Sequence, residues 1–210
     1  MRFSCLLVSA LLLAACGGDP PATSSCRLGA DAKVLAIGDS ITRGFGADGH
    51  GYPEQLQGLL RASAGRAGVQ VVNMGVDGER SGGLLARIDA AISANAPAVV
   101  LITTGGNDLL RRVDEASVRS NLGAIVQQVR MAGAWPVVFA VPKPTLSVAV
   151  GFGSDHEIYQ ELADGGTRVI PEVVGDVLAD DALRSDTIHP NANGYARMAQ
   201  AAFDALSECR

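Results

Sequence analysis

The fold is decided by the stretch Val34-Leu35-Ala36-Ile37-Gly38-Asp39-Ser40-Ile41-Thr42. Its four leading apolar residues are typical of a short parallel strand that is covered on both faces. In several hydrolase folds, a tight turn after such a strand lifts a serine hydroxyl to the carboxyl edge of the sheet. The residues after Ser40 can then open a helix whose first N–H groups hold an oxyanion. Gly-Asp-Ser is also an ordinary turn composition, so the role of Ser40 has to be judged from the rest of the chain.

Short apolar runs alternate with longer amphipathic stretches along the whole chain. This alternation predicts an α/β fold, a three-layer α/β/α sandwich around a parallel five-stranded sheet. Ligands of such sheets collect at the carboxyl ends of the strands. The predicted strands are Val34–Ile37, Val69–Asn73, Ala98–Thr103, Val137–Val141 and Arg168–Ile170, and the predicted helices are Tyr52–Ala64, Gly82–Ala94, Glu115–Ala132, Asp155–Ala163 and Asn191–Leu206.

A serine hydroxyl needs a base within hydrogen-bond reach before it can act as a nucleophile at neutral pH. Of the three histidines, His50, His156 and His189, only His189 follows an aspartate by three residues in a loop that can present both side chains. Asp186 would hold the imidazole in the required tautomer and offset the charge of the imidazolium. The order of the three residues then predicts Ser40, Asp186 and His189 as a catalytic set.

An acyl-transfer intermediate also needs hydrogen-bond donors for its oxyanion. The N–H groups of Ser40 and Gly75 are candidates, because each follows a predicted strand and glycine permits a close backbone approach. The segment Gly105-Gly106-Asn107-Asp108 follows the third predicted strand, and Asn107 can add a side-chain amide. By composition alone this segment would be read as a turn.

The chain begins with features of an exported lipoprotein. Arg2 and the short apolar run Leu6–Leu13 are typical of a signal peptide over residues 1–15. Leu13-Ala14-Ala15-Cys16-Gly17 resembles a bacterial lipobox, which predicts lipidation of Cys16 and a membrane anchor. A secretory signal with a chance cysteine is the alternative. Residues 16–30 would form the lipidated end and a flexible tether, residues 31–210 the folded domain, and the absence of Asp after Cys16 favours the outer membrane or cell surface.

Cys26 and Cys209 flank the predicted domain and would lie in an oxidising compartment. Because the ends of a compact domain are often close together, they are candidates for a disulfide. Two free thiols are the alternative.

Charge and composition exclude several classes of partner and cofactor. The chain has 17 Lys and Arg against 22 Asp and Glu, a formal net charge of −5, and removal of Arg2 would make it −6. No basic run indicates nucleic-acid binding, and no metal-ligand spacing is present. We expect no metal or cofactor, and a monomer.

These segments resemble, in order, spacing and content, those of the SGNH hydrolases, also called GDSL-type lipases and esterases. Gly-Asp-Ser opens the first block, Gly-Gly-Asn-Asp follows the third predicted strand, and Asp186-Thr187-Ile188-His189-Pro190-Asn191 precedes the last helix. The resemblance covers essentially the whole predicted domain. It is closest to the periplasmic branch of multifunctional thioesterases, arylesterases and lysophospholipases.

The resemblance implies a flavodoxin-like fold and a triad of Ser40, Asp186 and His189. It implies oxyanion donors at Gly75 and Asn107, and an Asp39 that supports the nucleophile loop without being catalytic. Ile41 replaces the commoner leucine, a volume-conserving change.

The predicted function is a serine ester hydrolase that forms an acyl-enzyme on short- to medium-chain esters, including aryl esters, thioesters and lysophospholipids. The apolar loop Pro142–Ser154 would contact the acyl chain or pack against the domain. A carbohydrate O-acetyl esterase of cell-envelope glycans is the alternative within enzymes. A non-catalytic lipoprotein that binds a lipid or glycan is the alternative outside them.

Overall fold

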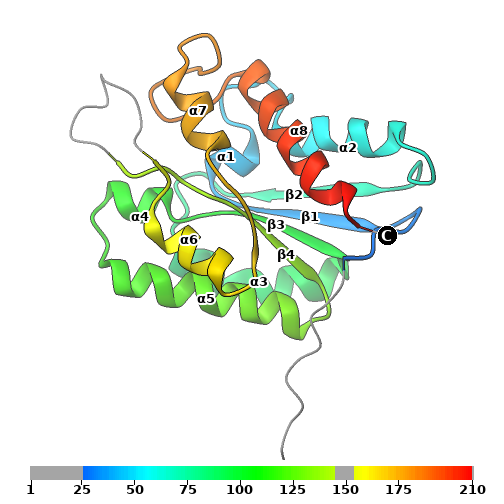
Figure 1. Cartoon of the computed structure of the whole chain (residues 1–210), viewed down its shortest axis with the longest axis horizontal. Helices are drawn as coiled ribbons and strands as arrows, with labels where there is room; N and C mark the ends of the chain where they lie inside the picture. The colour runs from blue at the N-terminus through cyan, green and yellow to red at the C-terminus, as the bar shows by residue number, and fades with distance from the viewer. Residues whose placement is uncertain (1–25, 145–153, 210) are drawn as a thin grey trace, which may run out of the picture.

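The protein folds around one parallel sheet, seen in the computed structural model of residues 26–144 and 154–209 (Figure 1). The predicted signal peptide, Cys16 and most of the predicted tether lie outside these residues, as do residues 145–153 of the predicted acyl-site loop. The strands are β1 (Lys33–Gly38), β2 (Gln70–Gly75), β3 (Val99–Thr103), β4 (Trp135–Phe139) and β5 (Arg168–Ile170). The helices are α1 (Ser40–Arg43), α2 (Tyr52–Ala62), α3 (Ser81–Asn95), α4 (Gly106–Leu110), α5 (Glu115–Met131), α6 (Glu157–Asp164), α7 (Val173–Ala179) and α8 (Ala192–Ser207).

The strand order is β2-β1-β3-β4-β5, the doubly wound order of flavodoxin-like folds. The predicted parallel five-stranded sheet and three-layer sandwich are therefore confirmed. The chain leaves β1 toward β2 and later returns to place β3 on the other side of β1. Connections depart in opposite directions at this point, which opens a crevice outside the carboxyl ends of β1 and β3. Ser40 and Asn107 follow these two neighbouring strands.

Each face of the sheet has its own apolar core, because alternate residues of a strand point to opposite faces. Val34 and Ala36 of β1 pack on the side of α2, α7 and α8, whereas Leu35 and Ile37 pack on the side of α3, α5 and α6. The same alternation in β3 explains why nearly every residue of both central strands is apolar.

The structure departs from the sequence prediction in two helices and two strands. Strand β4 covers Trp135–Phe139, two residues before the predicted Val137–Val141. Helices α4 and α7 were not expected, since five and seven residues are too few to show a clear helical period. Strand β2 continues two residues beyond Asn73, because pairing with β1 extends to Gly38 and Gly75. Gly75 is therefore the last residue of β2 and does not lie in the loop that follows it.

Cys26 and Cys209 form a disulfide, with their Cα atoms 4.7 Å apart. It joins the segment before β1 to the residues after α8, at the amino end of β1 and away from Ser40 (Figure 1).

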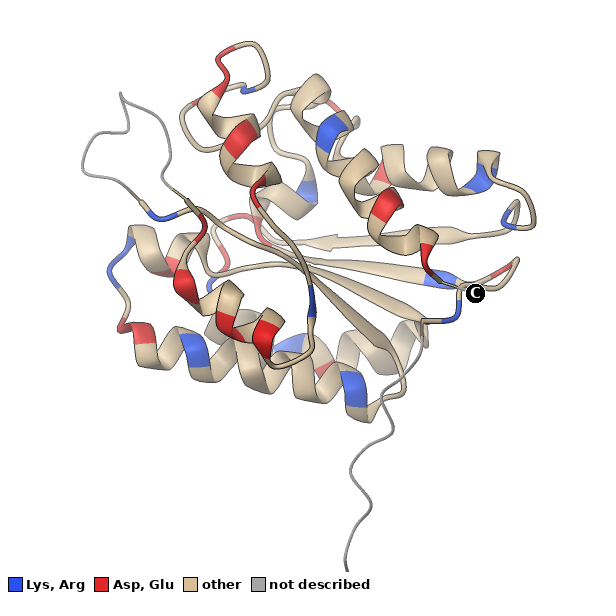
Figure 2. Ribbon diagram, in the orientation of Figure 1, with Lys and Arg blue, Asp and Glu red and all other residues tan. Residues whose placement is uncertain are grey.

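Both signs of charge occur on each side of the sheet (Figure 2): acidic residues lie on α6, α7 and α8, and basic residues on α2 and α5. In the described part of the chain, no helix has the length and apolar character needed to cross a membrane.

Candidate active site

Ser40 is the first residue of α1 and is largely buried, with 8% of its surface exposed. The turn before it needs glycine, because a Cβ on Gly38 would lie 2.0 Å from the carbonyl oxygen of Thr103. The absence of a side chain lets the ends of β1 and β3 come together under the serine. Asp39 caps the helix, since its carboxylate accepts a hydrogen bond of 3.0 Å from the N–H of Ile41.

His189 and Asp186 lie in a tight loop before α8. Asp186 Oδ1 accepts the N–H groups of Ile188 and His189 at 2.8 and 2.9 Å, and its Oδ2 lies 2.8 Å from His189 Nδ1. Asn191 fastens the loop to the helix, because its side chain accepts from Asn193 and Gly194 and donates to the Ala182 carbonyl. A three-residue spacing thus lets one carboxylate hold both the backbone and the ring of His189.

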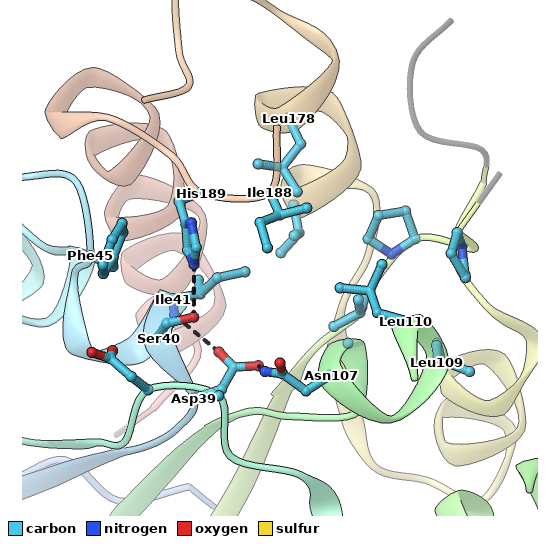
Figure 3. Close-up of a pocket in the computed structure, with 17 residues that line it drawn as sticks. Asp39, Ser40, Ile41, Phe45, Asn107, Leu109, Leu110, Leu178, Ile188 and His189 are labelled. Carbon is cyan, nitrogen blue, oxygen red and sulfur yellow. Dashed lines mark hydrogen bonds between the residues drawn. The ribbon is translucent and has the colours of Figure 1, made fainter. Parts of the chain in front are cut away.

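The structure brings Ser40 and His189 together although 149 residues separate them. Ser40 Oγ lies 2.9 Å from His189 Nε2 (Figure 3). The Phe45 ring stacks against the imidazole with 4.4 Å between ring centres. With Asp186 on the opposite ring nitrogen, the imidazole is held from three sides and can accept the serine proton.

The two aspartates of the site have pKa values shifted in opposite directions. Burial opposes ionisation of Asp186, but hydrogen bonds from Ile188 and His189 outweigh it and lower its pKa. Burial of Asp39 raises its pKa to about 7, against the opposing hydrogen bonds from Ile41 and Asn107. Asp186 is therefore a carboxylate at neutral pH, whereas Asp39 titrates in that range.

Asn107 lies in the first turn of α4, at the end of the strand next to β1. Its Nδ2 donates to Asp39 Oδ2 at 3.5 Å, and its side chain borders the same cavity as Ser40 (Figure 3). Asp39 thus contacts both α1, through the N–H of Ile41, and the side chain of Asn107.

Gly75 does not reach the cavity, which corrects its assignment as an oxyanion donor. Its N–H donates to Asn73 Oδ1 at 3.0 Å, and a Cβ at this residue would lie 2.1 Å from the Arg43 nitrogen. The absence of a side chain at Gly75 therefore lets α1 pack closely against β2. The error arose because the strand was expected to end at Asn73, two residues too early.

Gly78 lines the cavity in place of Gly75 and was missed by the sequence analysis. It lies in the turn of residues 76–80 between β2 and α3, with a positive φ of 70° that favours glycine. Among the described residues, neither the Ser40 N–H nor the Gly78 N–H has an acceptor within hydrogen-bond distance. The dipeptide Asp77-Gly78 is common in turns, and it is the sequence feature that could have identified this turn.

Ser40 and His189 open into a cavity of about 210 Å³. Asp39, Asn107 and the Asp77-Gly78 turn form its polar end. The rest is apolar, with walls from α1, α4, α7, the residues after β4 and the loop before His189. The apolar lining residues are Ile41, Phe45, Leu109, Leu110, Val141, Pro142, Pro144, Val174, Leu178 and Ile188.

The other two histidines lie outside this cavity. His156 is buried at the start of α6, where its Nδ1 accepts from the Ile158 N–H at 3.4 Å. His50 is exposed in the loop before α2. Within residues 26–144 and 154–209, no group of three or more His, Cys, Asp or Glu side chains is placed to hold a metal ion.

Residues 36–197 match the model of the GDSL-like Lipase/Acylhydrolase family. Esterase TesA of Pseudomonas aeruginosa is 31% identical over 178 residues, which are 82% of this chain and 87% of that protein. Thioesterase 1/protease 1/lysophospholipase L1 of Escherichia coli K12 is 28% identical, over 79% of this chain and 78% of that protein. The crystal structure of TesA superposes with a TM-score of 0.73 and 27% identity, covering 83% of this chain and 97% of that chain.

Proposed function

Because the chain belongs to the GDSL-like lipase/acylhydrolase family of SGNH hydrolases and is an ester hydrolase, we propose that Ser40, His189 and Asp186 are its catalytic triad. The observation that carries this proposal is the Ser40 Oγ to His189 Nε2 contact of 2.9 Å at the mouth of an apolar cavity. No other histidine of the described residues lies beside a cavity serine in this way.

The proposed reaction begins when Ser40 Oγ attacks the carbonyl carbon of the ester. His189 Nε2 takes the hydroxyl proton, and Asp186 stabilises the resulting imidazolium through the N–H on Nδ1. The C–O bond to the leaving group breaks as His189 returns this proton to the departing oxygen. An acyl group remains on Ser40, and a water molecule repeats the same steps to release the acid.

The oxyanion of both tetrahedral intermediates would be held by the N–H groups of Ser40 and Gly78 and the side-chain amide of Asn107. Two observations support this set: the two N–H groups have no acceptor among the described residues, and all three residues line the cavity. Asp39 would position Asn107 through its Oδ2 contact. Donors of this kind typically contribute about 3 kcal/mol each to transition-state stabilisation.

The proposed substrates are small esters with a short- to medium-chain acyl group, including aryl esters, thioesters and lysophospholipids. The apolar wall formed by α4, α7 and Ile188 supports this class, because an acyl chain beside Ser40 would be covered by Leu109, Leu178 and Ile188. Burial of each methylene there is favourable by about 0.8 kcal/mol.

The test is hydrolysis of p-nitrophenyl esters from acetate to palmitate, with Ser40→Ala and Ser93→Ala, a change at an exposed serine of α3, compared with the parent. We expect activity to peak between butyrate and octanoate and to be lost only in Ser40→Ala. Activity confined to acetate would instead favour a carbohydrate O-acetyl esterase. Turnover that survives in Ser40→Ala would refute the triad, and folded parent protein without turnover would favour a binding lipoprotein.

We also propose that residues 1–15 are removed on export, that Cys16 carries the lipid anchor, and that the folded domain acts at the outer membrane or cell surface as a monomer. This domain, expected at residues 31–210, begins earlier in the structure, because Cys26 is bonded to Cys209 and Leu28 is buried in the core. The disulfide of Cys26 with Cys209 supports an oxidising compartment. Replacement of Cys16 by Ser should shift the protein from the detergent phase to the aqueous phase on partitioning. Equal partitioning of the variant and the parent would contradict the anchor.

A further inference from the structure

The turn of residues 76–80, which carries Gly78, is held by side chains that the proposed reaction does not use. We propose that Arg87 with Glu79, and Asp108 with Ser81, are positioning groups that fix the Gly78 N–H relative to Ser40 and Asn107. This inference rests on the proposed function. It adds a specific role for two polar clusters that lie behind the cavity and do not touch the substrate.

The first cluster joins the turn to the strand ends beside the nucleophile. Arg87 of α3 binds Glu79 with two hydrogen bonds, Nε to Oε1 at 2.7 Å and Nη2 to Oε2 at 2.6 Å. The same Nη2 donates to the carbonyl oxygens of Met74 at 2.9 Å and Gly38 at 3.3 Å. One guanidinium therefore connects the residue after Gly78 with the carboxyl ends of β2 and β1.

The burial of this pair makes it more than a surface ion pair. The side chains of Arg87 and Glu79 are 25% and 10% exposed. A bidentate pair in this setting fixes orientation as well as distance, because both partners are planar. It is less exposed than the pair of Arg119 with Glu161, which has the same two-bond geometry but is 44% and 50% exposed.

The second cluster joins the start of α3, just after the turn, to helix α4, which carries Asn107. Asp108 is 1% exposed, and its carboxylate accepts from Ser81 N at 2.8 Å and from Ser81 Oγ at 2.7 Å. Asn121 of α5 donates to the same Oγ at 3.0 Å. Arg80, the residue that precedes α3, makes no side-chain cap, so Asp108 of α4 supplies the cap. Because Asp108 follows Asn107 directly, this contact sets the distance between helix α4, which carries Asn107, and the turn that carries Gly78.

Both clusters hold residues that follow Gly78, namely Glu79 and Ser81, and Arg87 also holds Met74, which precedes the turn. Oxyanion stabilisation depends on donors that are already in position before charge develops. A turn that loses one anchor should still permit substrate to enter the apolar cavity, since neither cluster lines it. It should hold the Gly78 N–H less accurately when the oxyanion forms. The expected signature is a lower kcat with an unchanged KM.

The test compares Glu79→Gln and Ser81→Ala with Glu161→Gln, the matched change in the remote Arg–Glu pair. We expect kcat on p-nitrophenyl butyrate to fall about ten- to a hundredfold in the first two variants, with KM changed less than twofold. Labelling of Ser40 by a p-nitrophenyl alkylphosphonate, which forms a tetrahedral adduct, should slow by a similar factor. Glu161→Gln should match the parent in both measurements.

Amide hydrogen exchange tests whether these side chains hold the turn, independently of catalysis. The N–H of Val76 donates to the Gly38 carbonyl at 2.8 Å, and that of Glu79 to the Val76 carbonyl at 3.2 Å. Their amide hydrogen exchange should quicken in Glu79→Gln and not in Glu161→Gln. Unchanged exchange, or unchanged kcat and labelling in folded variants of an active parent, would overturn the positioning role. A parent that hydrolyses no ester would refute the proposed function, while the exchange rates would still decide whether the pair holds the turn.

Discussion

Reduction of the Cys26–Cys209 disulfide should remove much of the stability of this protein. The bond closes a loop with a sequence separation of 183 residues, nearly the whole described chain. The chain-entropy relation gives about 5 kcal/mol of stabilisation for a loop of this length at 25 °C, because the cross-link restricts the unfolded ensemble. Domains of this kind are stable by only about 5–15 kcal/mol in total. The reduced protein should therefore be close to marginal.

The assay is equilibrium unfolding in urea at pH 7, followed by circular dichroism with and without a phosphine reductant. We expect the unfolding midpoint to fall on reduction and the m-value to rise, since the unlinked chain exposes more surface when unfolded. The variant Cys26→Ala/Cys209→Ala is the control and should be insensitive to reductant. A loss below about 1 kcal/mol on reduction would refute the entropic reasoning, and the same loss in the control would show that reductant acts elsewhere.

Three further predictions concern the site. Replacement of Asp186 by Asn should lower kcat by about 10³–10⁴-fold with little change in KM, because the carboxylate no longer selects the imidazole tautomer; steady-state kinetics on p-nitrophenyl butyrate measure this, and a loss under tenfold would contradict the role. The pKa of Asp39 is raised by burial from 3.8 to about 7, so ionisation should cost the folded state about 4 kcal/mol as the pH rises from 4 through 7. The stability that protonated Asp39 provides below pH 4 is therefore lost as the pH rises through 7. In Asp39→Asn, the free energy of unfolding in urea should depend less on pH across that range; the same pH dependence in variant and parent would argue against this. Gly75→Ala should lower the free energy of unfolding by about 1–3 kcal/mol, because its Cβ would meet the Arg43 nitrogen; an unchanged thermal midpoint would show that α1 shifts without cost.

Much of the fold could be predicted because the apolar residues of β1 and β3 identify them as buried strands. Val34–Ile37 and Val99–Ile102 are apolar on both faces, a pattern typical of a strand covered by helices on both sides. The long helices were recognisable from their apolar spacing, as α5 shows with Val118, Leu122 and Val129 buried at helical intervals. The short helices α4 and α7 had no such repeat, and their positions depend on the loops and strands around them.

The sheet, its parallel strands and the residue types of the candidate triad could be predicted from the sequence, because they depend on periodicity and on local spacing such as that of Asp186 and His189. Which glycine faces the cavity could not be predicted, because it depends on strand pairing. The end of β2 is set by its pairing with β1, so Gly75 is drawn into the sheet and Gly78 is left at the turn. Likewise, no local pattern relates Arg87 to Gly38 or Asp108 to Ser81. Such contacts join loops distant in sequence, and their geometry exists only once the strands are placed side by side.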